Sequence, residues 1–192
     1  MMGHAWNGSD AGPRRRWRAV TWGGAAALLL TPLLAMQFTH EVRWTGSDFA
    51  AFGLLLALPL GALDLAMRRT ENASYRAAAA LALGAAALMT WVNLAVGIVG
   101  SEGNPLNLAF FGVLAVGVLG ACIARFRPRG MARTLARMGI AQALIALAAL
   151  IAGYPEGLLT GVFVVAWIVS ARLFRRAAGE RAVVGKAGMP PG

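Results

Sequence analysis

The stretch WVNLAVGIVGSEGNPLNLAFFGVLAVGVLGA (residues 91–121) consists of two glycine-dotted apolar runs joined by a short polar segment. Glu102 is the acid of that segment, and Ser101, Asn104 and Asn107 are its polar neighbours. Glycine, asparagine and proline side by side, as at residues 103–105, are typical of a turn. The stretch therefore predicts a hairpin between two long apolar helices.

The rest of the chain repeats this pattern of apolar runs and short polar connections. Of its 192 residues, 58% are hydrophobic and only 14% are charged, whereas soluble domains average about 25% charged residues. Because a bilayer core is about 30 Å thick, a spanning helix needs about 20 mostly apolar residues. Six segments meet or approach that length: about 19–38, 49–67, 77–100, 106–124, 135–153 and 157–174. We therefore predict an all-α fold, a single integral membrane bundle of six transmembrane helices.

The ends of the chain are polar and basic. Residues 1–18 are expected to form a disordered N-terminal tail, and residues 175–192 a flexible C-terminal tail. The first apolar segment follows the basic sequence RRRWR (residues 14–18), an order that also describes a secretory signal peptide. The length of that segment and the lack of a cleavage motif after it favour a retained helix, and removal of the helix stays an alternative.

The basic residues are distributed unevenly over the connections. All Lys and Arg residues except Arg43 fall in the two tails, in every second connection, or, as Arg137 and Arg172 do, near the end of a segment next to one of these. Since short basic connections stay in the cytoplasm, this pattern places both termini there. The net charge of +10 raises the question of nucleic-acid binding. We expect no nucleic-acid partner, because the charges flank the apolar segments.

Polar residues also collect on the side predicted to lie outside. A cation or a polar headgroup needs oxygen ligands of this kind. The alternative is an ordinary solvated surface with a hairpin turn in it. The candidate residues for an outer ligand site are Gln37, Glu41, Asp48, Asn93, Glu102, Asn104, Asn107 and Glu156.

Asn93 is the strongest of these candidates, because it is predicted to lie within the hydrocarbon region of the bilayer. A helix that continues to residue 100 places Asn93, Gly97 and Gly100 on one face. An intramembrane amide is costly unless it has a partner. Two interpretations are open for Asn93 and equally for Gln142, namely a hydrogen bond between helices or contact with a ligand or water path.

Two further patterns concern the connection around residues 124–137 and the helix before it. Gly117, Gly120 and Ala124 form a stripe of small residues, which predicts close helix packing. Arg125, Arg127, Arg129 and Arg133 are candidate contacts for anionic lipid, worth about 1 kcal/mol for each basic residue near the surface. Determination of topology alone also explains these arginines.

Recognisable catalytic motifs are missing from the sequence. Its two histidines, His4 and His40, are predicted on opposite sides of the membrane, and the lone Cys122 excludes an internal disulfide. No metalloprotease, nucleophile-elbow or nucleotide-binding motif occurs. We therefore predict no catalytic residues, no metal site and no cofactor. A membrane enzyme that uses Glu41, Asp48 or Glu102 as acid or base is the alternative.

Three stretches resemble segments of small multi-pass bacterial inner-membrane proteins that have no assigned activity: MQFTHEVRW (36–44), residues 91–117 and ARFRPRGMAR (124–133). The resemblance implies a bacterial inner membrane and says nothing about catalytic residues. We expect an accessory or scaffold subunit, or a small permease-like module. Its expected partners are membrane lipid and other membrane proteins or a second copy of the chain.

Overall fold

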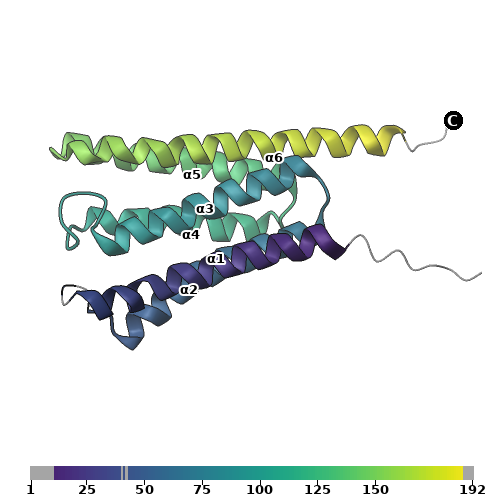
Figure 1. The fold of residues 1–192 in the computed structure, drawn as a ribbon. Coiled ribbons are helices and arrows are strands. Elements are labelled where there is room, and N and C mark those ends of the chain that lie inside the picture. Colours follow the sequence, from purple (N-terminus) through teal and green to yellow (C-terminus); the bar gives the residue numbers. More distant parts are fainter. Residues whose placement is uncertain (1–10, 40, 42, 188–192) are drawn as a thin grey trace, which may run out of the picture. The chain divides into compact units, whose positions relative to one another are not determined.

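A computed structural model describes residues 11–39, 41 and 43–187 (Figure 1). Those residues contain no strand and form these helices: α1 (Ala11–Phe38), α2 (Gly46–Arg69), α3 (Ala73–Ala95), α4 (Leu106–Ile123), α5 (Pro128–Ile151), the 3-10 helix η1 (Pro155–Thr160) and α6 (Gly161–Ala187). Within the described part of the chain, six helices are long and apolar enough to cross a membrane. The prediction of an all-α, six-span membrane protein is confirmed.

The chain divides into two compact units, Met1–Asp64 and Leu65–Gly192, where the sequence predicts a single bundle. In the first unit, Arg18 Nε lies 3.3 Å from Asp64 Oδ1, which pairs α1 with α2. A Cβ atom placed on Gly53 lies 3.9 Å from Leu29 Cδ2. No residue of α2 is buried by the protein itself. These two helices therefore present their apolar side chains outward, as lipid-facing helices do.

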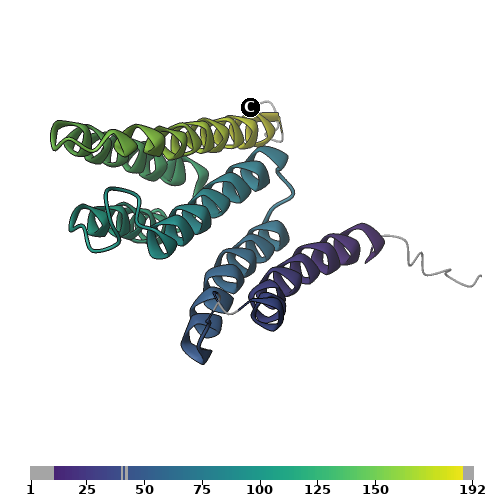
Figure 2. The same ribbon diagram turned by 60° about the vertical axis from the view of Figure 1, so that its left-hand side comes forward.

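The second unit contains α3 to α6 and holds the buried core of the described residues. Helix α6 packs against α3 and α5, and α5 also packs against α4 (Figure 2). Met89, Phe110, Trp167 and Phe174 are among its fully buried side chains. Four helices joined by short connections thus bury a continuous interior.

Small residues let α4 and α5 approach closely. A Cβ atom on Gly117 would lie 2.8 Å from Met138 Sδ, and one on Gly120 would overlap Thr134 Cγ2. A side chain at position 120 would clash with the β-branched Thr134, and one at position 117 would displace the Met138 side chain. The packing predicted for the small-residue stripe of this helix is confirmed.

The helices run in alternating directions, which gives the second unit two distinct ends. Glu180, near the end of α6, accepts hydrogen bonds from Asn72 Nδ2 (2.7 Å) and Ser74 Oγ (3.0 Å), so the end of α6 lies beside the start of α3. We call residues 70–76, 123–133 and 174–182 the arginine-rich end. Residues 96–107 and 153–160, at the other end, form the turn end. Figure 1 shows the connections of these two ends at opposite extremes of α3 to α6.

Several helix boundaries differ from the predicted segment bounds. Helix α3 ends at Ala95, because Gly97 and Gly100 adopt φ values of +70° and +65°, which glycine tolerates and other residues rarely adopt. Asn93, Gly97 and Gly100 therefore do not share a helix face, and that prediction is wrong. Helix α5 already begins at Pro128, where a missing N–H costs nothing at a first helical position.

The outermost helices are also longer than predicted. Helix α1 begins at Ala11 and α6 continues to Ala187, so both extend into stretches expected to be tails. Residues 1–10 and 188–192, which include His4, lie outside the described residues, as does His40.

Candidate functional site

Three of the predicted outer residues belong to the first unit. Gln37 lies near the end of α1 and Glu41 in the connection, and both are exposed. Asp48 occupies the first turn of α2, where its Oδ2 atom accepts hydrogen bonds from Thr45 N (2.7 Å) and Thr45 Oγ1 (2.8 Å). The Asp48 carboxylate therefore serves to organise the start of α2.

At the turn end of the second unit, Asn107 replaces the hydrogen-bond partners that the broken helix lacks. Its Oδ1 atom accepts hydrogen bonds from Ile98 N and Val99 N, both at 3.0 Å. Its Nδ2 atom donates to Ser101 O at 2.9 Å and to Val99 O at 3.3 Å. The side chain of Asn107 is thus fully used in closing the turn between α3 and α4.

The other two asparagines of the predicted outer site also hydrogen-bond to backbone groups, each through one side-chain atom. Asn93 Nδ2 donates a 2.9 Å hydrogen bond to the carbonyl of Asn107, so the interhelical bond that one interpretation predicts is present. Asn104 Oδ1 accepts a 3.0 Å hydrogen bond from Leu106 N at the start of α4. The three asparagines therefore build the turn.

The remaining outer acids, Glu102 and Glu156, are exposed and hydrogen-bond no residue that the structure describes. Among the described residues, no group of three His, Cys, Asp or Glu side chains is placed to hold a metal ion. Glu102 and Glu156 therefore stand as separate exposed groups.

Polar atoms inside the second unit show a different anomaly. Gln142 on α5 is completely buried, and neither its Nε2 nor its Oε1 atom has a hydrogen-bond partner among the described residues. The indole Nε1 atom of Trp167 on α6 and the Oδ1 atom of Asn93 are also buried without a partner. Each unpaired group costs about 1–3 kcal/mol. The interhelical hydrogen bond that one interpretation predicts for Gln142 is not formed.

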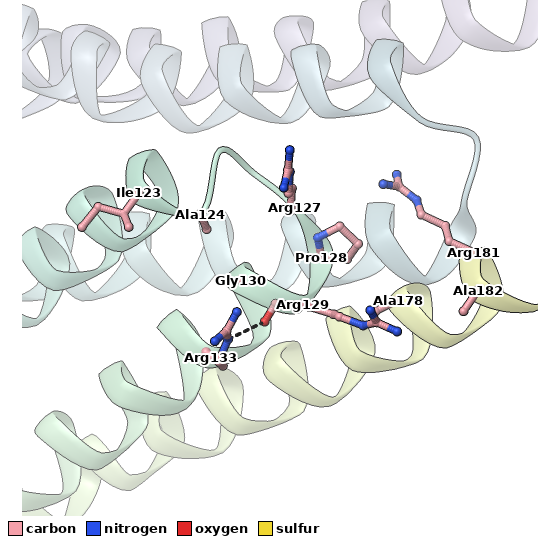
Figure 3. A pocket seen from close by; sticks show the side chains of 10 residues that line it. All are labelled: Ile123, Ala124, Arg127, Pro128, Arg129, Gly130, Arg133, Ala178, Arg181 and Ala182. Atoms are coloured by element: carbon pink, nitrogen blue, oxygen red, sulfur yellow. Dashed lines mark hydrogen bonds between the residues drawn. The ribbon is translucent and has the colours of Figure 1, made fainter. Parts of the chain in front are cut away.

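The arginine-rich end contains a pocket with a volume of about 700 Å³ (Figure 3). Four arginines line it: Arg127, Arg129, Arg133 and Arg181. The other lining residues are Ile123, Ala124, Pro128, Gly130, Ala178 and Ala182. Figure 3 shows the side chain of Arg181 extending from α6 in the direction of Arg127. The pocket thus joins the turn between α4 and α5 to the last turns of α6.

The sequence predicted three of these four arginines as a group. Arg125, the fourth residue predicted there, is exposed but does not line the pocket. Arg181 was missed, because it belongs to a different helix far along the chain. The predicted alternation of helix directions places the end of the last helix at the same end of the bundle as this turn, and that was the available signal.

The turn that carries Arg127 is tight and strained. Arg125 and Phe126 have φ values of +47° and +56°, and such conformations cost about 1–3 kcal/mol for residues other than glycine. Phe126 N donates to Ala121 O at 3.1 Å, which ends α4. A Cβ atom on Gly130 would lie 2.5 Å from Ala124 Cβ, so this glycine lets α5 begin directly against the end of α4.

The pocket is electropositive because its arginines have no neutralising acid. No carboxylate lines it, and none of the four arginines forms a salt bridge with a described acid. The neighbouring Glu180 accepts hydrogen bonds elsewhere, from Asn72 Nδ2 (2.7 Å) and Ser74 Oγ (3.0 Å) as well as from Arg176 Nε (3.0 Å). None of the guanidinium groups that line the pocket is therefore paired with a described carboxylate.

The start of α5 adds hydrogen-bond donors to this charge. The first helical bond runs from Met131 N to Arg127 O at 2.9 Å. The N–H groups of Arg129 and Gly130 precede that bond, so they have no partner within the helix. Such groups at a helix start attract anions, and here they belong to residues that line the pocket.

Comparison with known proteins gives no match to this chain: no family model, no curated protein and no solved structure is significantly similar to it. The resemblance to small bacterial inner-membrane proteins stays a prediction. The function is therefore inferred from the geometry of the arginine-rich end.

Proposed function

We propose that the protein is a non-catalytic accessory protein of a bacterial inner membrane that binds an anionic phospholipid headgroup in the arginine-lined pocket. The observation that carries this proposal is the convergence of four arginines from two separate segments on one pocket without an acid. Arginine binds phosphoryl oxygens through two parallel N–H donors, and this geometry makes it the preferred phosphate ligand among cationic side chains.

The apolar part of the pocket supports a lipid as the ligand. Ile123, Ala124, Ala178 and Ala182 line it together with the arginines. A phospholipid offers a phosphate to the guanidinium groups and a glycerol and acyl stem to these apolar side chains. Positive charge at a cytoplasmic end follows from topology alone. A common pocket shared by α5 and α6 does not follow from topology, and so it supports a dedicated site.

The proposal is tested on the purified full-length chain by native mass spectrometry with phosphatidylglycerol or phosphatidylcholine. We expect preferential binding of phosphatidylglycerol, and about thirtyfold weaker binding by the Arg127→Gln/Arg181→Gln variant, from about 1 kcal/mol for each lost charge. Arg172→Gln/Arg175→Gln is the matched control, because both residues are exposed arginines of α6 outside the pocket lining.

Three outcomes would contradict this function. An equal loss in both double variants shows that general surface charge, and not the pocket, attracts the lipid. Equal binding of the two lipids removes the anionic preference. If millimolar inorganic phosphate displaces the lipid completely, the pocket is a site for a free anion.

A small permease-like module is the second candidate function. The unpaired amide of Gln142 favours it, since intramembrane polar groups often mark a solute path. Flux of small neutral solutes in proteoliposomes tests this alternative. Gln142→Leu lowers the flux if the amide belongs to a path, and an unchanged flux removes Gln142 from any such role.

A further inference from the structure

Tyr75, in the first turn of α3, contacts both walls of the arginine-lined pocket without lining the pocket itself. It is 8% exposed. Its hydroxyl donates a 2.9 Å hydrogen bond to the carbonyl of Phe126 in the α4–α5 turn. Its ring lies under the guanidinium of Arg181, with Cζ 5.5 Å from the ring centroid. One side chain thus connects the two segments that supply the arginines.

The contact with Phe126 fixes the wall that carries Arg127. The carbonyl of Phe126 belongs to the peptide unit that leads directly into Arg127. This peptide follows two residues in the left-handed region, Arg125 and Phe126, whose conformation is unfavourable without support. A hydrogen bond from the buried Tyr75 hydroxyl holds the peptide in one orientation, and with it the direction in which Arg127 leaves the turn.

The contact with Arg181 fixes the opposite wall. Stacking on an aromatic ring uses the face of the guanidinium and leaves the N–H groups at its edge available to an anion. One of these groups, on Nη2, donates to Thr70 Oγ1 at 3.2 Å. The Tyr75 ring is itself held edge-on by Phe174, with centroids 4.9 Å apart at 87°. Arg181 is therefore oriented by two neighbours that belong to the α2–α3 connection and α3.

The α2–α3 connection is tied to α6 by further hydrogen bonds. Asn72 Nδ2 and Ser74 Oγ both donate to the carboxylate of Glu180, the residue before Arg181. Asn72 Oδ1 also accepts from Tyr75 N at 2.8 Å, which caps α3 at its first turn. These hydrogen bonds fix the first turn of α3, which carries Tyr75.

We infer that Tyr75 is the positioning residue of the anion site, because it sets the placement of Arg127 and Arg181 relative to one headgroup phosphate. This inference rests on the proposed lipid-binding function. The new element is that Tyr75 raises the affinity of the pocket for lipid without touching the lipid. Tyr75 acts only through the α4–α5 turn and through Arg181.

The test is a double-mutant cycle measured as phosphatidylglycerol affinity of the full-length chain. Tyr75→Phe removes the hydroxyl alone and keeps the packing of the ring, so we expect about three- to tenfold weaker binding. Tyr75→Leu removes the ring as well and weakens binding further. Tyr75→Leu and Arg181→Gln together weaken it by less than the product of their single effects, because both remove the same placement of Arg181.

Tyr154, the second of the two tyrosines, supplies the matched control. It lies at the turn end, where its Cε1 atom is 3.0 Å from a Cβ placed on Gly100. Tyr154→Phe and Tyr154→Leu leave lipid affinity unchanged, and their effects show no coupling to Arg181→Gln. Tyr75→Phe also serves as the safeguard against misfolding, since it removes a single hydrogen bond.

The outcomes separate this inference from the function on which it rests. The inference is overturned if Tyr75→Phe binds lipid like the unmodified protein, or if Tyr75→Leu and Arg181→Gln act independently while the pocket arginines still matter. A role in stability alone lowers the melting temperature without coupling to Arg181, and that result also overturns the inference. If the unmodified protein shows no preference for anionic lipid, the proposed function and the inference fail together.

Discussion

The two ends of the second unit each gather polar side chains at a helix connection, yet they use them in opposite ways. At the turn end, Asn107 places both of its amide atoms on backbone groups and closes the loop. At the arginine-rich end, Arg127 and Arg129 line a pocket in which none of the lining residues is an acid. Short amide side chains near a broken helix form hydrogen bonds with its backbone N–H and C=O groups. Long arginine side chains extend away from the backbone. We therefore look for a ligand site where polar side chains lack a protein partner, and not simply where many polar residues occur.

The largest expected effect concerns the sides of the membrane on which the two ends lie. In a Cys122→Ser background, Gly103→Cys reacts completely with a membrane-impermeant maleimide added to whole cells, and Arg125→Cys does not react. Gly103 is exposed with open space around its Cβ position, and Arg125 is also exposed, so accessibility within the fold is matched.

The labelling contradicts the predicted orientation if the cysteine at position 125 reacts or the one at position 103 fails to react. Permeabilised cells provide the control, because both cysteines then react. Reversed labelling would move the arginine-lined pocket to the outer leaflet, away from the anionic lipid of the cytoplasmic face.

The second effect is the loss of the turn end when its central side chain is removed. Asn107→Leu leaves Ile98 N and Val99 N without acceptors, and we expect the free energy of unfolding to fall by about 3 kcal/mol. Thermal unfolding in detergent measures this change. Asn104→Ala breaks a single hydrogen bond, to Leu106 N, and we expect about 1 kcal/mol from it.

The comparison between the two ends also predicts what these variants leave intact. Folded Asn107→Leu protein binds phosphatidylglycerol with unchanged affinity, because the pocket lies at the other end. Equal destabilisation by the two asparagine substitutions would show that Asn107 does not organise the turn.

The smallest effect is expected in the interior between the two ends. Gln142→Leu exchanges an amide without hydrogen-bond partners for an apolar side chain of similar size, and we expect the free energy of unfolding to rise by about 1 kcal/mol. Chemical denaturation in mixed micelles measures it, with the exposed Ile140→Leu as the control. A clear loss of stability would mean that a bound water or solute pairs with Gln142.

Much of the fold could be predicted because the bilayer imposes length and apolarity on each helix. Residues 106–123 form a helix as the apolar run predicts, with Gly117 and Gly120 facing α5. The end of α3 could not be predicted, since Gly97 and Gly100 continue the apolar run. The hydrogen bonds that stabilise the broken helix come from Asn107, eight and nine residues further along the chain.

The candidate site was predictable only where its residues are neighbours in the sequence. Arg127, Arg129 and Arg133 form a local run of charge, and that run indicated lipid contacts. Arg181 joins them through the packing of α6 against α5. Tyr75 gave no signal as a positioning residue, because its role depends on the unusual backbone of Phe126. Sequence alone could not show that Asn93 Nδ2, Asn104 Oδ1 and the Asn107 side chain bond to backbone groups, because the helix break that brings these groups together is not visible in the apolar pattern.

The central claim, that the arginine-rich end and not the turn end receives a lipid headgroup, is tested most directly by mapping the headgroup on the protein. Membranes that contain the full-length chain are supplied with phosphatidylglycerol carrying a photoreactive group on its headgroup, then irradiated and analysed by peptide mass spectrometry. We expect cross-links within residues 123–133 and 178–182, and their loss in Arg127→Gln/Arg181→Gln. Cross-links concentrated in residues 97–107 or at Glu156, with none at the arginine-rich end, would contradict the claim.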